Sequence, residues 1–312
     1  MIEGQKIIAF TPCGRKRYMD LLAGYVLREH ERGHIDEWIL FNNAYFTDDA
    51  TYADQLAAHW PWVKIFRGVK EGGGNWQARN YAASESDFIY KFYNQMTEGD
   101  GVIYIRLDDD IVFIEENTIP TLIRYRLDNP EPFLVFPIII NNLRTLERMQ
   151  ASGIIPTQWE GAKYNWHRED FLFRLHLKTL EAIRKGEVLS KFDLPSARFT
   201  NFDAGWLSIN AFAIFGKDML ACDVPEPEER YLALTRPQEL NRQNARVGNT
   251  AVVHFAYHGQ MEIMDKSGLL AEYAKYAPPL GFETVGSFVP PPMDDVHKSM
   301  YHNILSAWSK NK

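Results

Sequence analysis

The sequence predicts an α/β protein built on a mixed, mainly parallel β-sheet flanked by helices. Two observations predict it: segments of strand character alternate with helical segments through the first half of the chain, and one strand-like segment leads directly into three consecutive aspartates. Such alternation is typical of parallel strands joined by crossover helices. In open sheets of this kind ligands bind beyond the carboxyl ends of the strands, so the aspartates mark the expected site.

Short apolar runs bounded by turn residues predict the strands. The first run is expected to break at a Thr-Pro-Cys-Gly turn, and the fourth ends in the three aspartates. In chain order the predicted strands are Lys6–Phe10, Glu37–Phe41, Val63–Phe66, Val102–Leu107, Phe133–Ile140, Phe212–Phe215 and Ala251–Phe255.

Apolar residues at helical spacing predict the helices between these strands. In the first of them, Leu22, Val26 and Leu27 share one face. Asn75, which follows a run of three glycines, is a suitable cap for the third. The predicted helices are Met19–Glu31, Asp48–His59, 75 to about 96, and Glu169–Lys185.

The chain contains no internal repeat and no low-complexity block that would divide it. From about Gly259 onward the sequence mixes helical and proline-rich character. We therefore expect a single domain over residues 1–258 and a C-terminal extension over residues 259–312.

Composition excludes several classes of protein. The 312 residues are 46% hydrophobic and 24% charged, which excludes a disordered tail, a collagen-like fibre and a disulfide-stapled miniprotein. The net charge of −7, from 34 Lys+Arg against 41 Asp+Glu, argues against a broad surface for nucleic acid. The net charge does not argue against a local basic pocket for a phosphate.

The cysteines and the apolar runs indicate a cellular compartment. Cys13 and Cys222 are too few for a disulfide framework or a cysteine zinc site, so reduced thiols are expected. The first residues do not have the pattern of a signal peptide, and the longest apolar run, Phe133–Ile140, is far shorter than the ~20 residues that span a bilayer. We expect a cytoplasmic protein without a transmembrane segment, with membrane contact restricted to its surface.

Asp108 and Asp110 are candidate ligands for a hard divalent cation, which would also bind phosphate oxygens and water. The alternative is an acidic turn that caps the next segment, and one D-x-D is expected by chance in about every chain of this size. The apolar runs on both sides favour a functional role, because buried charges are costly unless something pairs with them.

His254, at the end of the Ala251–Phe255 run, is either a core histidine bonded to a backbone carbonyl or a metal ligand. His258 competes with it for the second role. Arg79 could pair with a diphosphate or be a solvated surface residue. The same two interpretations apply to the basic residues after the first strand, Arg15, Lys16 and Arg17.

Several acidic and aromatic side chains could serve a sugar site. A glutamate cluster before a helical stretch either stabilises the helix N-terminus or supplies a general base for an acceptor hydroxyl. Its members are Glu226, Glu228 and Glu229, and Asp203 is a further carboxylate candidate. Tryptophan rings could stack on a sugar or belong to the core; the candidates are Trp159, Trp166 and Trp206.

The order of these motifs over roughly residues 6–258 resembles metal-dependent glycosyltransferases of the GT-A (Rossmann-like) fold, most closely the family 2-like inverting enzymes. The matching segments are Ile7–Pro12, EWILF with Asn42 and TDDAT, Gly74 with Ala78-Arg79-Asn80, IYIRLDDD, AGWLSINAFAIFGKDM, Glu228-Glu229 and AVVHF. The chain departs from the family in having Glu-Glu where Glu-Asp is usual and Asn42 where many members have Asp. Its stretch from Ala78 to Asp108 is also longer than usual.

The resemblance implies a nucleotide-sugar half over about residues 1–115 and an acceptor half over about 116–258. It implies that the nucleotide is bound by Thr11, Pro12, Asn42, Arg79, Asp108 and Asp109. It further implies a metal site formed by Asp108, Asp110 and His254, and a catalytic base at Glu229.

The implied function is a hexosyl- or pentosyltransferase of polysaccharide biosynthesis, which moves a sugar from a nucleotide-sugar, with a UDP-sugar favoured, to a glycan or glycolipid. It uses Mn²⁺ or Mg²⁺ and inverts the anomeric centre, or retains it if Asp203 faces the donor. One alternative is a nucleotidyltransferase, although PCGRKR lacks the glycine-rich loop of that class. The other is a non-catalytic sugar-binding protein with a structural Ca²⁺.

Overall fold

The computed structural model describes residues 1–42, 44, 47–67, 93, 96–156, 169–199, 206–222, 224, 228–282, 295 and 299. The strands are β1 Lys6–Cys13, β2 Glu37–Asn42, β3 Val63–Arg67, β4 Val102–Leu107, β5 Ile111–Ile114, β6 Val135–Ile140, β7 Ala197–Phe199, β8 Ala211–Phe215 and β9 Asn244–His254. The longer helices are α1 Lys16–Glu31, α2 Thr47–His59, α4 Thr118–Asp128, α5 Leu143–Ala151 and α7 Glu169–Lys185.

Shorter helices complete the described part of the chain. They are α8 Val188–Phe192, α9 Gly216–Leu220, α10 Glu228–Arg230, α11 Arg236–Glu239, α12 Met261–Lys266 and α13 Leu269–Ala274. A π-helical turn, η2 Tyr231–Thr235, follows α10, and a 3₁₀ turn, η3 His258–Gln260, precedes α12.

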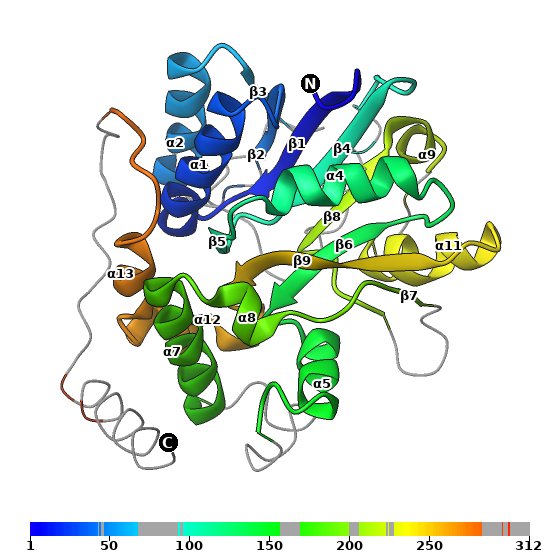
Figure 1. Cartoon of the computed structure of the whole chain (residues 1–312). Helices are drawn as coiled ribbons and strands as arrows, with labels where there is room; N and C mark the ends of the chain where they lie inside the picture. The colour runs from blue at the N-terminus through cyan, green and yellow to red at the C-terminus, as the bar shows by residue number, and fades with distance from the viewer. Residues whose placement is uncertain are drawn as a thin grey trace.

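Within the described residues the strands form one nine-stranded sheet in the spatial order β3-β2-β1-β4-β8-β6-β9-β5, with β7 beside β9 (Figure 1). β1 to β4 are parallel, β8 is antiparallel to β4 and β6, and β6 is parallel to β9. The carboxyl ends of β1, β2, β4, β6 and β9 therefore meet at one edge, where β8 begins. The predicted fold class, a mixed and mainly parallel sheet flanked by helices in one domain, is confirmed.

The helices bury the faces of this sheet because their apolar residues recur at helical spacing. In α1, Leu22 and Val26 are fully buried, and the helix packs on β5. α4 packs on β6, β8 and β9. Burying one such aliphatic side chain contributes about 1.5–3 kcal/mol. In Figure 1, α5, α7, α8 and α12 lie in the lower half of the molecule, away from the N-terminus at the top.

β1 is longer than the sequence predicts, because it continues through Thr11 and Pro12 instead of breaking there. β1 pairs with β4 only as far as Phe10, whereas its pairing with β2 continues to Cys13. Beyond Phe10 the strand is therefore bonded on one side only, and an edge-like position tolerates a proline without an N–H group.

Other boundaries also differ. β9 begins at Asn244, seven residues before the predicted start at Ala251, and ends one residue earlier, at His254. β5, α4 and α5 were not predicted. Of the predicted helix over 75–96, Tyr93, which is helical, and Met96 lie within the described residues. The segment after Gly259 adds Met264, Leu269, Leu270 and Tyr273 to the same hydrophobic core as the sheet.

No helix among the described residues has the length and apolar character that crossing a bilayer requires.

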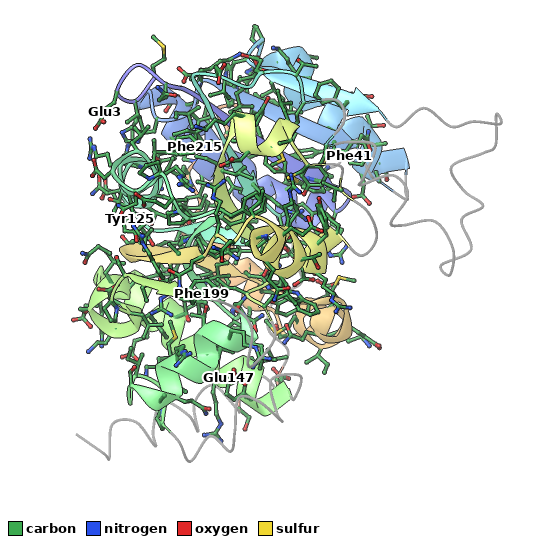
Figure 2. The ribbon with its side chains drawn as sticks, turned by 90° about the vertical axis from the view of Figure 1, so that its right-hand side faces the viewer. Glu3, Phe41, Tyr125, Glu147, Phe199 and Phe215 are labelled. Atoms are coloured by element: carbon green, nitrogen blue, oxygen red, sulfur yellow. The ribbon has the colours of Figure 1, made fainter. Side chains whose placement is uncertain are left out.

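Figure 2 views the molecule from the side: Phe41, at the end of β2, lies in the upper half, and Glu147, on α5, lies near the bottom.

Candidate functional site

The acidic turn after β4 lies at the edge where the parallel strands end. The register explains this: Leu107 pairs with Ala211 at the start of β8, and Ile111 pairs with His254 at the end of β9. The turn closes through a hydrogen bond from the Ile111 N–H to the Asp108 carbonyl, 3.1 Å. Asp108, Asp109 and Asp110 thus lie between β1, β8 and β9, as the sequence predicts.

Asp109 holds the loop between β1 and α1. Its carboxylate is 3% exposed, accepts a hydrogen bond of 3.0 Å from the Gly14 N–H, and is bound by the Arg15 guanidinium through Nε and Nη2. These contacts satisfy both oxygens of Asp109. Contact of Asp109 with a nucleotide stays a prediction.

Asp110 and His254 form a buried pair. His254 Nε2 lies 3.2 Å from Asp110 Oδ2, and Arg15 Nη2 lies 2.9 Å from the same oxygen. Burial alone would raise the pKa of Asp110, but Arg15 and then His254 hold this pKa below its usual value. Within the described part of the chain, Asp110 Oδ1 and His254 Nδ1 are buried without a hydrogen-bond partner.

This pair fits the requirements of a small divalent cation. Carboxylate and imidazole are suitable donors for Mn²⁺, and two neighbouring ligands of an ion with bonds of about 2.1 Å lie about 3 Å apart. The unpartnered Asp110 oxygen gives a second buried donor atom at the same place. Among the described residues no group of three or more His, Cys, Asp or Glu is arranged to hold a metal.

Asp108 faces a different set of partners. Its Oδ1 accepts from Arg106 Nε at 2.8 Å, and its Oδ2 accepts from Asn210 Nδ2 at 3.1 Å. The structure thus joins Asp110 to His254, whereas the contacts of Asp108 turn it toward β8 and α10. The predicted role of Asp108 in metal binding is not tested by these contacts.

Arg106, the one charged residue of β4, lies at the centre of a buried polar network. Its Nη1 contacts Glu228 on α10 and the hydroxyl of Tyr93, the latter at 2.6 Å, and Tyr93 donates to Glu228. Burial raises the pKa of Glu228, an effect that Arg106 opposes. Glu228 is therefore a partner of Arg106.

Glu229, the neighbour of Glu228, lines a pocket of about 310 Å³. The Ser208 hydroxyl donates a hydrogen bond to Glu229 Oε1. The volume is at the lower end of the range for small-molecule sites, about 300–1,000 Å³. The pocket is lined by Asn142, Leu143, Arg144, Trp206, Ser208, Glu229 and Tyr257.

Tyr257 connects this pocket to the acidic turn. Its hydroxyl donates to Asn210 Oδ1 at 3.0 Å and accepts from Asn142 Nδ2 at 3.3 Å, and Asn210 in turn bonds Asp108. The Tyr257 ring lies 4.3 Å from the ring of His254. One side chain therefore touches the pocket and the Asp110–His254 pair.

Residues predicted to bind the nucleoside lie at the ends of β1 and β2. Thr11 is fully buried, and its hydroxyl accepts from the Trp38 indole at 3.0 Å. Asn42 is 6% exposed; it accepts from the Ala44 N–H at 3.1 Å and donates to the Ala50 carbonyl at 3.4 Å. Pro12 is half-buried beside them. Nucleoside contact by these three residues stays a prediction.

Some candidates lie outside the described residues: Arg79, Asp203, Glu226, Trp159, Trp166 and the side chain of His258. The sequence interpretation did not select Arg106, Asn142, Arg144, Ser208, Asn210 or Tyr257. A single charge inside the apolar run VIYIRL was a usable signal for Arg106, since a buried strand carries a charge only with a partner. The other residues are polar side chains without a distinctive spacing; Arg144 lies in the first turn of α5, and the rest lie outside the helices and strands.

No protein-family model matches this chain, and no curated protein matches it. Solved structures similar to it include a mannosyltransferase from Pyrobaculum calidifontis in complex with GDP-Man and Mn²⁺. The two sequences are 11% identical, and the match covers 99% of this chain and 76% of that one, with a TM-score of 0.47. Another is the glucosyl-3-phosphoglycerate synthase of Mycobacterium tuberculosis with Mn²⁺, UDP and glucosyl-3-phosphoglycerate, 12% identical, covering 92% and 84%, TM-score 0.40.

A nucleotidyltransferase is also among these structures. CMP:2-keto-3-deoxy-manno-octonic acid synthetase with CTP is 13% identical and covers 87% of this chain and 99% of that one, TM-score 0.44. A match to the mycobacterial synthase with phosphoglyceric acid spans half of that protein, 50%, at a TM-score of 0.33. Similarities of this degree do not decide the activity, which has to be argued from the residues.

Proposed function

We propose that this chain is a glycosyltransferase that moves a sugar from a nucleotide-sugar donor to a hydroxyl of a glycan or glycolipid. One observation supports the proposal most directly: the pocket that contains Glu229 shares Tyr257 with the buried Asp110–His254 pair. Glu229, a carboxylate that could accept a proton, thus lies near the Asp110–His254 pair, which could hold a cation, at the same edge of the sheet. The order of sequence motifs supports the same function.

On the donor side, Asp110 and His254 would hold Mn²⁺ or Mg²⁺. When bound, the ion would stabilise the negative charge of the departing diphosphate. Arg15 Nη2 lies 2.9 Å from Asp110 Oδ2, so the ion would share this oxygen with the guanidinium. Thr11, Pro12, Asn42 and Arg79 would complete the nucleotide site, and we favour a UDP-sugar as donor.

On the acceptor side, Glu229 would take the proton of the attacking hydroxyl. The Ser208 hydroxyl donates a hydrogen bond to Glu229 Oε1, which orients this carboxylate in the pocket where an acceptor hydroxyl would bind. Trp206 and Tyr257 give the pocket aromatic walls, which suit the apolar faces of a sugar ring. The hydroxyl then attacks the anomeric carbon in line, and one displacement inverts that centre.

The contacts of the basic loop disfavour nucleotidyl transfer. That chemistry needs the loop after β1 to bind a triphosphate, whereas Arg15 is bound to Asp109 and Asp110, and Arg17 pairs with Asp265 on α12. Both guanidinium groups thus already have carboxylate partners.

The first test is calorimetric titration with UDP and then GDP, with Mn²⁺ and again with a chelator. We expect metal-dependent binding that is lost in Asp110→Ala and kept in Asp128→Ala, which removes an exposed carboxylate at the end of α4. Absence of binding by both nucleotides under both conditions would instead favour the sugar-binding protein.

The second test concerns the base. Glu229→Gln should keep nucleotide affinity and lose at least about 100-fold in turnover, in the range expected for removal of a general base. Full transfer activity in that variant would refute the role of Glu229.

A further inference from the structure

We propose that Arg106 is a positioning residue that couples the two sides of the site by holding Asp108 and helix α10 in one fixed relation. This inference rests on the proposed function, in which α10 carries the base Glu229, and on the sequence-based expectation that Asp108 contacts the donor. Arg106 itself is 5% exposed. It would contact neither donor nor acceptor, and it would act through the two carboxylates that it binds.

The guanidinium uses separate nitrogens for its two partners. Nε binds Asp108 Oδ1 at 2.8 Å, and Nη1 binds Glu228 together with the Tyr93 hydroxyl. The side chains of Arg106, Asp108 and Glu228 are 7%, 18% and 10% exposed. Charges so buried keep their partners, because leaving one unpaired costs several kcal/mol. One arginine therefore fixes the distance between the acidic turn and α10.

A second connection joins the same two places from the other side. This connection is segment 208–210, which precedes β8. Ser208 donates a hydrogen bond to Glu229. Asn210 binds Asp108 twice: its side-chain amide donates to the carboxylate, and its carbonyl accepts from the Asp108 N–H at 2.8 Å. Asp108 and α10 are thus linked twice, once through Arg106 and once through segment 208–210. A closed set of contacts of this kind transmits a shift of one carboxylate to the other.

The coupling predicts an effect of one side on the other. When a ligand binds Asp108, the interaction of this carboxylate with Arg106 weakens or strengthens. The interaction of Arg106 with Glu228 then changes as well. Because coupling between two places acts in both directions, a change at Glu228 should alter ligand affinity on the Asp108 side. Glu228 should therefore influence nucleotide binding from the acceptor side, whereas the pocket-lining neighbour Glu229 should not.

The first experiment is a double-mutant cycle on folding, with Asp108→Asn and Glu228→Gln. Each single variant leaves Arg106 with one carboxylate, and only the double variant leaves it with none. We expect the unfolding equilibrium constant of the double variant to exceed the additive expectation about fivefold or more. The control cycle pairs Asp108→Asn with Glu37→Gln, a nearly buried glutamate that binds Lys64; it should be additive within about twofold.

The second experiment measures UDP affinity with Mn²⁺. We expect Glu228→Gln to weaken binding about three- to tenfold and Glu229→Gln to leave it within twofold. Turnover should show the opposite pattern: Glu229→Gln should lose more turnover than Glu228→Gln.

The outcomes distinguish a failure of the coupling through Arg106 from a failure of the proposed function. An additive folding cycle overturns the coupling even if UDP binds. A coupled cycle with unchanged UDP affinity in Glu228→Gln reduces Arg106 to a structural residue and also overturns the positioning role. If neither UDP nor GDP binds the wild-type protein, the proposed function fails, and the folding cycle alone still decides whether Arg106 couples the two carboxylates.

Discussion

The imidazole Nε2 of His254 lies 3.2 Å from Asp110 Oδ2, although the two residues come from the ends of different strands. The contact exists because Ile111, the first residue of β5, pairs with His254 in the antiparallel β5–β9 ladder. The register of the sheet thus brings the last aspartate of the acidic turn to this histidine. His254 Nε2 and Asp110 Oδ2 are thus the two atoms spaced like neighbouring ligands of a cation, and Asp110 Oδ1 is a further buried oxygen without a hydrogen-bond partner in the described structure.

His254→Ala should lower Mn²⁺ affinity at least about tenfold, because the substitution would remove one of the two protein ligands that we propose for the ion. The titration is followed calorimetrically or by the electron paramagnetic resonance signal of free Mn²⁺. His59→Ala serves as control, since His59 is exposed at the end of α2. Equal affinity in the His254 variant and the wild type would remove His254 from the metal site.

Arg15→Gln should destabilise the fold by about 3 kcal/mol, near the lower end of the cost of breaking a buried ion pair. The reason is that Asp109 and Asp110 are almost fully buried and share this guanidinium. The measurement is urea unfolding at pH 7. Adding Asp109→Asn to the variant should recover part of the loss, because one of the unpaired charges then disappears.

Arg17→Gln is the matched control for Arg15→Gln. Arg17 is as exposed as Arg15, 26% against 27%, but its partner Asp265 is 31% exposed instead of buried. A solvated pair contributes about 0–1 kcal/mol. If both variants lose the same stability, burial of the aspartates is not what makes Arg15 important.

The sequence could predict all the strands except β5 and β7, and the acidic turn, because their signals are local. Val102–Leu107 is an apolar run that ends in aspartates, and β4 has those bounds. Likewise the Ala251–Phe255 run predicted the end of β9 within one residue. What the sequence could not predict depends on tertiary pairing: that Asp109 binds Arg15, that Glu228 binds Arg106, and that only Glu229 of the two lines the pocket.

Gly24→Ala should destabilise the protein by about 1–3 kcal/mol, the usual cost of overpacking. A Cβ at Gly24 would lie 2.1 Å from the carbonyl oxygen of Pro278, in the segment after α13 that crosses α1. Tyr25 anchors the same segment through a 3.2 Å bond to the Tyr276 carbonyl. Thermal unfolding measures the effect, and Gly259→Ala is the control, because a Cβ there meets no atom within 4 Å.

The stability of the fold should fall below pH 6.5 because of His176. This histidine is fully buried between α7 and α13, where its Nδ1 contacts the Tyr273 hydroxyl at 2.9 Å and its Nε2 has no partner in the described structure. Burial, assisted by His254, lowers the pKa of His176 to about 3. The unfolded chain, with a histidine pKa of about 6.5, therefore binds a proton that the folded protein does not bind.

The sign follows from this difference in bound protons. The contribution of His176 is fully present above pH 6.5 and decreases by up to about 1.4 kcal/mol per pH unit as the pH falls from 6.5 toward 3. Between pH 7 and pH 5 the free energy of unfolding should drop by about 2 kcal/mol through this residue. His176→Gln, which cannot be protonated, should remove that part of the slope in urea unfolding measured across the range. The control variant is His59→Gln, at an exposed position of α2. An unchanged slope in His176→Gln would assign the acid sensitivity to other groups.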